Sequence, residues 1–143
     1  MSRIAEILEG KSRDVISVDH EATVYATVKA MVDANVGAVL VTDGDAVTGI
    51  FTERDFLRRV AAEERPPRET RVRDVMTSPV IVVNPETSVE EVMALMSDRR
   101  IRHAPVMGDG GVVGMISIGD LVNFQSRQQT FQLQYLQDYI TAR

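Results

Sequence analysis

The sequence contains no cysteine among its 143 residues. This absence excludes disulfide bonds, thiol nucleophiles and metal sites built on cysteine. Histidine is almost as scarce, since only His20 and His103 are present and neither has a second histidine at helical spacing. We therefore expect no metal site and no catalytic cofactor.

Long apolar runs and an excess of positive charge are also missing. No run approaches the roughly 18 apolar residues of a membrane helix, and the opening MSRIAEILEG has no signal-peptide core. We therefore expect a cytoplasmic protein with no membrane partner. A net charge of -5 argues against nucleic-acid binding, which needs concentrated positive potential, although a local basic cluster is still able to bind a phosphate.

The sequence contains an internal repeat. Residues 15–56 align with residues 80–121 at an offset of 65 and without a gap. Identical residues occur in the second copy at the positions of Val15, Ile16, Val18, Glu21, Val24, Met31, Asp33, Val41, Val47, Gly49 and Asp55. Because repeats set the architecture, we expect two similar units.

Each repeat is predicted to form strand, helix, strand, strand and helix, which makes the fold class α+β. Short β-branched runs at 16–18 and 81–83 predict the first strands. Thr23 and Ser88 precede the first helices, and Glu91 is placed to complete a capping box with Ser88. Asp-Gly-Asp and Gly-Asp-Gly-Gly predict the two hairpin turns. Helical spacing predicts core faces at Val24, Val28, Met31 and Val32, and at Val89, Val92, Met93 and Met96.

The expected domain organisation follows from the repeat and from the prolines that separate its two copies. We predict a first repeat with an N-terminal helix over 1–62, a linker over 63–71, a second repeat over 72–124 and a helical extension over 125–143. Adjacent prolines in EERPPRET stop the helix that precedes them. A unit of this size cannot bury all its apolar surface alone, so the repeats are expected to pack with pseudo-twofold symmetry.

One motif occurs in both repeats, as GIFTERD from Gly49 and as GMISIGD from Gly114. A hydroxyl residue followed three positions later by an acid is a common helix N-cap. Alternatively, the hydroxyl, the aspartate and the amides of the first helical turn converge on a small molecule, in which the aspartate holds ribose hydroxyls and the amides a phosphate. Both interpretations stay open from the residues alone.

Both repeats resemble cystathionine-β-synthase (CBS) domains, and the pair resembles the two-repeat module that binds adenosine ligands. The resemblance covers roughly Val15 to Val122 and also rests on VRDVMT from Val72 and RIRHAPVM from Arg100. It implies a regulatory sensor for AMP, ADP, ATP, NAD(H) or S-adenosylmethionine. Such a module would signal by conformational change to a separate protein that the sequence does not identify.

The resemblance also implies the residues of two sites. Asp55 and Asp120 would hold ribose hydroxyls. The first repeat departs from the pattern, because LEGKSRD replaces the more usual VMTSP before its first strand. Arg58 and Arg59 are expected on a solvated helix face. The implied second site contains Thr77, Pro79, Val80, Ile81, Ile101, Arg102, His103, Ser117 and Asp120; the first contains Asp14, Val15, Ile16, Val36, Gly37, Ala38, Thr52, Arg54 and Asp55.

Two other functions remain as alternatives. The first is a structural dimerisation module whose sites are vestigial. The second is a nucleotide-hydrolysing enzyme with Asp55 or Asp120 as the base, but the sequence has neither a Walker loop nor a paired-histidine metal site. We therefore do not expect an enzyme.

The last 23 residues contain neither proline nor glycine and predict one long helix. Phe124, Phe131 and Tyr135 lie near one face, with Leu133, Leu136 and Ile140 beside them. An apolar face of this width needs cover. We expect a homodimer contact there, with cover by the same chain as the alternative.

Overall fold

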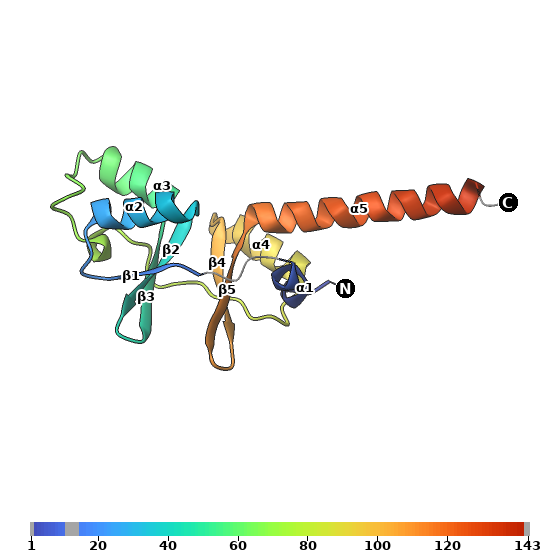
Figure 1. The fold of residues 1–143 in the computed structure, drawn as a ribbon, viewed down its shortest axis with the longest axis horizontal. Helices are drawn as coiled ribbons and strands as arrows, with labels where there is room; N and C mark the ends of the chain where they lie inside the picture. The colour runs from blue at the N-terminus through green and yellow to red at the C-terminus, as the bar shows by residue number, and fades with distance from the viewer. Residues whose placement is uncertain (1, 11–14, 142–143) are drawn as a thin grey trace. The chain divides into compact units, whose positions relative to one another are not determined.

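The computed structural model describes residues 2–10 and 15–141, with side chains described up to residue 138 (Figure 1). It forms two compact units, of which one is contiguous in sequence and the other is not. One unit spans residues 14–82, and the other joins residues 1–13 to residues 83–143. Each unit therefore contains the segment that precedes the other repeat in sequence.

The unit of residues 14–82 is a three-stranded sheet with helices. The sheet order is β1-β2-β3, in which β1 and β2 are parallel and β2 and β3 antiparallel. Its core includes the fully buried Val24, Val39, Val41, Phe51 and Val60. The elements are β1 (Ser17–Asp19), α2 (Val24–Ala34), β2 (Ala38–Asp43), β3 (Ala46–Thr52), α3 (Glu53–Asp55), the π-helix η1 (Phe56–Ala61) and the 3₁₀ helix η2 (Val72–Asp74).

The other unit pairs an antiparallel hairpin with three helices. Its core includes Ile4, Val92, Val106, Ile116 and Leu121, all fully buried. The elements are α1 (Ile4–Glu9), α4 (Val89–Arg99), β4 (His103–Gly108), β5 (Gly111–Ser117) and α5 (Ile118–Thr141). In Figure 1, α5 continues well beyond α1 and α4 of its own unit. The α+β class, the two repeats and the long C-terminal helix are thus confirmed.

The helix N-caps predicted at Thr23 and Ser88 are present. Thr23 Oγ1 accepts a hydrogen bond from the Ala26 amide at 3.1 Å, and Ser88 Oγ accepts one from the Glu91 amide at 3.1 Å. The predicted core face of α2 is too wide, however, because Val32 is 71% exposed. It follows the buried Met31 by one residue, which turns its side chain about 100° away from the core.

The strand predicted over residues 81–83 is wrong. The structure has only an isolated bridge between Val83 and Val106 there. In the first repeat the Leu40 amide donates to Ile16 O at 3.0 Å and so extends the pairing of β1 with β2. The residue equivalent to Leu40 in the second repeat is Pro105, which has no N–H to donate to Ile81, so the ladder stops.

The segment before each repeat docks on the other repeat in the same way. Residues 70–72 exchange backbone hydrogen bonds with residues 22–24, and residues 2–4 do so with residues 87–89. Met76 Sδ then lies 2.4 Å from where a Cβ on Gly49 would sit, and Leu8 Cδ2 lies 2.7 Å from the same point on Gly114. Leu8 is therefore the counterpart of Met76, at an offset of 68 that the ungapped alignment did not reveal.

This docking predicts a specific interaction between Leu8 and Gly114. Gly114→Ala should lower the free energy of unfolding by about 1–3 kcal/mol, because the new methyl group overlaps Leu8. Leu8→Ala in the same chain should relieve the overlap, so that the double variant loses at least about 0.5 kcal/mol less than the sum of the two single losses. Urea denaturation measures all three values.

Gly110→Ala in the same hairpin is the control, since its Cβ would have nothing within 4 Å. It should leave stability nearly unchanged. Additive losses for Leu8→Ala and Gly114→Ala would contradict the docking of the N-terminal segment on the second repeat.

Candidate functional site

The repeated motif forms a capping box in both units. In the first, Asp55 N donates to Thr52 Oγ1 at 3.1 Å and Thr52 N donates to Asp55 Oδ2 at 3.0 Å. In the second, Asp120 N donates to Ser117 Oγ at 3.0 Å and Ser117 N donates to Asp120 Oδ2 at 2.8 Å. The N-cap interpretation of the motif is confirmed, and it leaves the ligand interpretation open because each carboxylate has a second oxygen.

The second oxygen of Asp55 has partners of its own. Asp55 Oδ1 accepts a hydrogen bond from Thr77 Oγ1 at 2.9 Å and lies 3.8 Å from Arg59 Nε. The Asp55 residue is only 6% exposed. A buried carboxylate is stable only when hydrogen bonds or an opposite charge compensate its lost hydration, and here it has both.

Arg59 connects the motif to the docked segment. Its Nη1 donates to Met76 O at 2.6 Å while its Nε faces Asp55. The expectation that Arg59 lies on a simply solvated face is therefore wrong, although its side chain is half exposed. The available signal was its spacing of four residues from Asp55, which places both side chains on one face of a helix.

Thr77 lies beside Asp55 and belongs to the same unit. Its backbone pairs with Ile50 at the end of β3, with Thr77 N donating to Ile50 O at 2.8 Å and Ile50 N to Thr77 O at 3.0 Å. Pro79, exposed, and Val80 and Ile81, half buried, belong to the same unit as Thr77. The resemblance groups these residues with the second motif, and these hydrogen bonds of Thr77 are with the first repeat.

Other predicted site residues do lie next to their motifs. Ala38 pairs with Thr52 across β2 and β3, and His103 pairs with Ser117 across β4 and β5. The first helical amides donate to the residue just before the first strand of each hairpin, from Glu53 N to Gly37 O at 3.0 Å and from Ile118 N to Arg102 O at 2.8 Å. Each helix start is therefore adjacent to the residues proposed as the wall of its site.

The remaining predicted site residues pack against the cores or are partly buried. Ile16 and Val36 pack against the core of the first unit, and Ile101 packs against the core of the second. Val15 and Arg54 are half buried. Asp14 lies outside the described residues.

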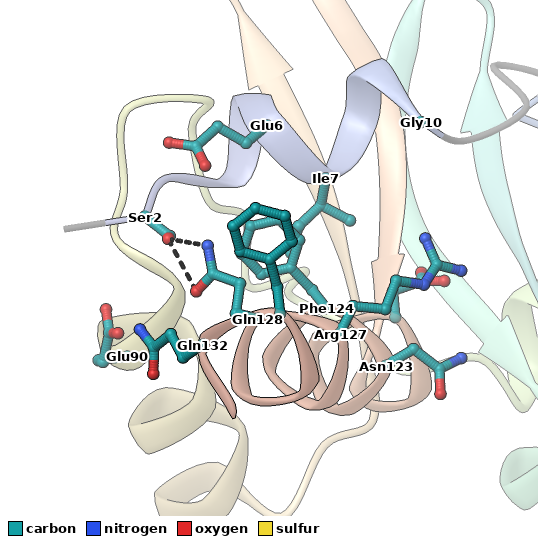
Figure 2. Close-up of a pocket in the computed structure, with 12 residues that line it drawn as sticks. Ser2, Glu6, Ile7, Gly10, Glu90, Asn123, Phe124, Arg127, Gln128 and Gln132 are labelled. Atoms are coloured by element: carbon teal, nitrogen blue, oxygen red, sulfur yellow. Dashed lines mark hydrogen bonds between the residues drawn. The ribbon is translucent and has the colours of Figure 1, made fainter. Parts of the chain in front are cut away.

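A cavity of about 820 Å³ adjoins Asp120. Figure 2 shows its lining, with Asn123, Phe124 and Arg127 among the labelled residues. Its polar groups include Asn123 and Arg127, which follow Asp120 at three and seven residues along α5, and its apolar groups include Ile7 and Phe124. Sequence reasoning missed Asn123 and Arg127, although their helical spacing from Asp120 was available as a signal. The unit of residues 14–82 has a cavity of about 480 Å³ between α2 and the start of η1 that includes Gly37 and Glu53.

The described residues place limits on other chemistry. Among residues 2–10 and 15–141, no group of three His, Asp or Glu side chains is arranged to hold a metal ion. Within the same ranges, no helix combines the length and the apolar character needed to cross a membrane.

Two α+β repeats with a capping box after each hairpin define a tandem-repeat protein. The sequence model of the CBS domain matches residues 4–62 and 72–127. The chain belongs to the CBS-domain family and contains two CBS domains.

Several known proteins are similar to this chain. CBS domain-containing protein CBSX3, mitochondrial, of Arabidopsis thaliana is 46% identical over 123 residues, which cover 82% of this chain and 60% of that protein. Protein MK0525 of Methanopyrus kandleri is 32% identical over 125 residues, which cover 86% of this chain and 64% of that protein. The chain thus spans less than two thirds of the length of either relative.

Solved structures show the same fold. A CBS-domain protein of Burkholderia ambifaria MC40-6 matches with a TM-score of 0.81 and 44% identity, over 85% of this chain and 91% of that one. The hexameric CBS-CP12 protein from bloom-forming cyanobacteria matches with a TM-score of 0.76 and 34% identity, over 84% of this chain and 70% of that one.

The contact between Thr77 and Asp55 predicts a measurable contribution to stability. Thr77→Val removes a hydroxyl donor from a buried carboxylate and should cost about 1–3 kcal/mol, as expected for a hydrogen bond to a charged group. Ser78→Ala, which removes the exposed neighbouring hydroxyl bonded to Thr48 O, should cost less. Equal losses from the two variants in urea denaturation would show that the bond to Asp55 has no special weight.

Proposed function

We propose that the protein is a regulatory module that binds an adenosine-containing ligand at its motif aspartates. The observation that carries this proposal is the geometry of the two capping boxes. Each places an aspartate carboxylate, a hydroxyl and the amides of a helix start within hydrogen-bonding distance of one another at the end of a strand. Such a cluster offers acceptors for ribose hydroxyls and donors for a phosphate.

The cap and the ligand do not compete for the same atoms. Oδ2 of each aspartate accepts the cap amide, and Oδ1 of Asp55 accepts Thr77. A carboxylate has about four acceptor positions, so a ribose hydroxyl can join Thr77 on Asp55 without displacing the cap. Nearby apolar side chains such as Phe124 at the second motif and Val36 at the first suit an adenine ring.

The contact at Asp55 also suggests how a bound ligand would be sensed. Thr77 belongs to the segment that runs from the first repeat into the second. A ligand that hydrogen-bonds Asp55 would change the strength of the bonds from Asp55 to Thr77 and Arg59. It would therefore favour one docked position of this segment over another. The regulated protein would be a separate chain, and the site of action would be the cytoplasm.

Two alternatives are weaker. Capping alone accounts for an acid at each motif, so a structural module with vestigial sites remains the second candidate. A hydrolase is the third, and no group of three His, Asp or Glu side chains among the described residues is arranged to hold a metal ion for it. The structural module gives no role to the cavity beside Asp120.

A thermal-shift screen with AMP, ADP, ATP, NAD and S-adenosylmethionine tests the proposal. At 100 times its dissociation constant a true ligand should stabilise the protein by about 2.7 kcal/mol. Asp120→Ala should reduce binding at the second motif at least tenfold by calorimetry while the Ser117 cap hydroxyl helps to keep the fold. Asp98→Ala, an exposed acid near the end of α4, is the matched control and should bind as the wild type does.

The outcomes separate the three functions. No shift with any of the five compounds would support the structural module. Release of adenosine products or phosphate from the same samples would support the enzyme. Binding that survives both Asp55→Ala and Asp120→Ala would contradict the assignment of the ribose to these aspartates.

A further inference from the structure

The end of α5 carries an apolar face that the described residues do not cover. Phe131 is 75% exposed and Tyr135 is 65% exposed. The side-chain amide of Gln128 donates a hydrogen bond to Ser2 Oγ at 3.0 Å (Figure 2). Phe131 lines the same cavity as Ser2, whereas Tyr135 does not. An isolated helical stretch of about a dozen residues is marginal in water, so this part of α5 needs a packing partner.

The apolar residues of this stretch lie on two opposite sides. At about 100° per residue, Phe124, Phe131 and Tyr135 share one side with Arg127 and Asp138. Leu133 lies on the opposite side from Phe131, so the expectation that it sits beside the aromatic residues is wrong. Phe124 packs against the core of its unit, so we call the exposed remainder of the first side, composed of Arg127, Phe131, Tyr135 and Asp138, the aromatic stripe.

The charges of the aromatic stripe are self-complementary in one orientation only. Between residues 125 and 141 the sequence has two charged residues, the basic Arg127 and the acidic Asp138. They lie eleven residues apart, and Phe131 and Tyr135 lie between them. A parallel pair of such helices would place like charges together, whereas an antiparallel pair would place Arg127 of each helix near the partner's Asp138.

We propose that the aromatic stripe of α5 binds a second copy of this chain as an antiparallel helix pair with twofold symmetry. A register that sets Phe131 against the partner's Tyr135 centres the pair near residue 133. Arg127 then lies opposite position 139, within one residue of the partner's Asp138. Aromatic packing at the centre and two ion pairs at the flanks are thus satisfied by one register, which is the arrangement an isologous contact requires.

Charge reversal tests the orientation in protein free of nucleotide. Arg127→Glu alone and Asp138→Arg alone should each weaken dimerisation about tenfold at low salt, since each turns two attractive pairs into repulsive ones. An equimolar mixture of the two single variants should recover association, because each heterodimer then contains only opposite charges at the flanks. The double variant Arg127→Glu with Asp138→Arg should also recover it. Sedimentation equilibrium measures the four samples.

A control variant and a test variant replace apolar residues on opposite sides of α5. Leu133→Gln, on the opposite side and 61% exposed, should leave the dimer unchanged, whereas Phe131→Gln with Tyr135→Gln should dissociate it. Circular dichroism confirms that each variant is folded before it is compared. Because no nucleotide is present, these results do not depend on the proposed ligand function.

Three results would overturn the proposal. These are a wild type that stays monomeric at several hundred micromolar, single charge variants that dimerise as the wild type does, and a mixture that fails to associate although both single variants are folded. An α5 contact that is parallel, or a dimer formed elsewhere on the chain, would produce one of the last two results.

Discussion

The close approach of a preceding chain segment to the glycine of each motif is the contact on which both units depend. Met76 lies against Gly49 and Leu8 against Gly114 at distances that leave no room for a Cβ. The buried residues of the same segments, Ile4 in one unit and Val72 in the other, complete the two cores. A glycine is needed because the segment packs directly on the backbone of the strand that leads into the motif.

The same contact brings polar groups of the docked segment to the motif of the first repeat. Docking of residues 72–82 carries the Thr77 hydroxyl to Asp55 and the Met76 carbonyl to Arg59. The Asp55 carboxylate therefore caps the helix and also hydrogen-bonds the docked segment. Under the proposed function, this coupling between the motif carboxylate and a connecting segment would be the physical basis for regulation.

The features that the sequence predicted best are the helix caps, which depend on hydrogen bonds between residues close together in the chain. Thr23 and Ser88 cap their helices because a hydroxyl before a helix satisfies an amide that has no other partner. The capping boxes at Thr52 and Ser117 follow from the same rule. The strand at residues 81–83 failed where a neighbour in space decides the outcome, because Pro105 has no N–H to donate. The error at Val32 is local, because the turn of about 100° from Met31 points its side chain away from the core.

The sequence by itself determined that there are two α+β repeats, where their helices begin, and that each contains a hydroxyl and an aspartate on one helical turn. These features depend on periodicity and on hydrogen bonds between residues three apart. Only the tertiary structure decided which segment completes which repeat, and hence that Thr77 belongs with Asp55 and Leu8 with Gly114. The reason is that an internal repeat offers two nearly equivalent docking surfaces, and the choice between them depends on packing between residues far apart in the chain.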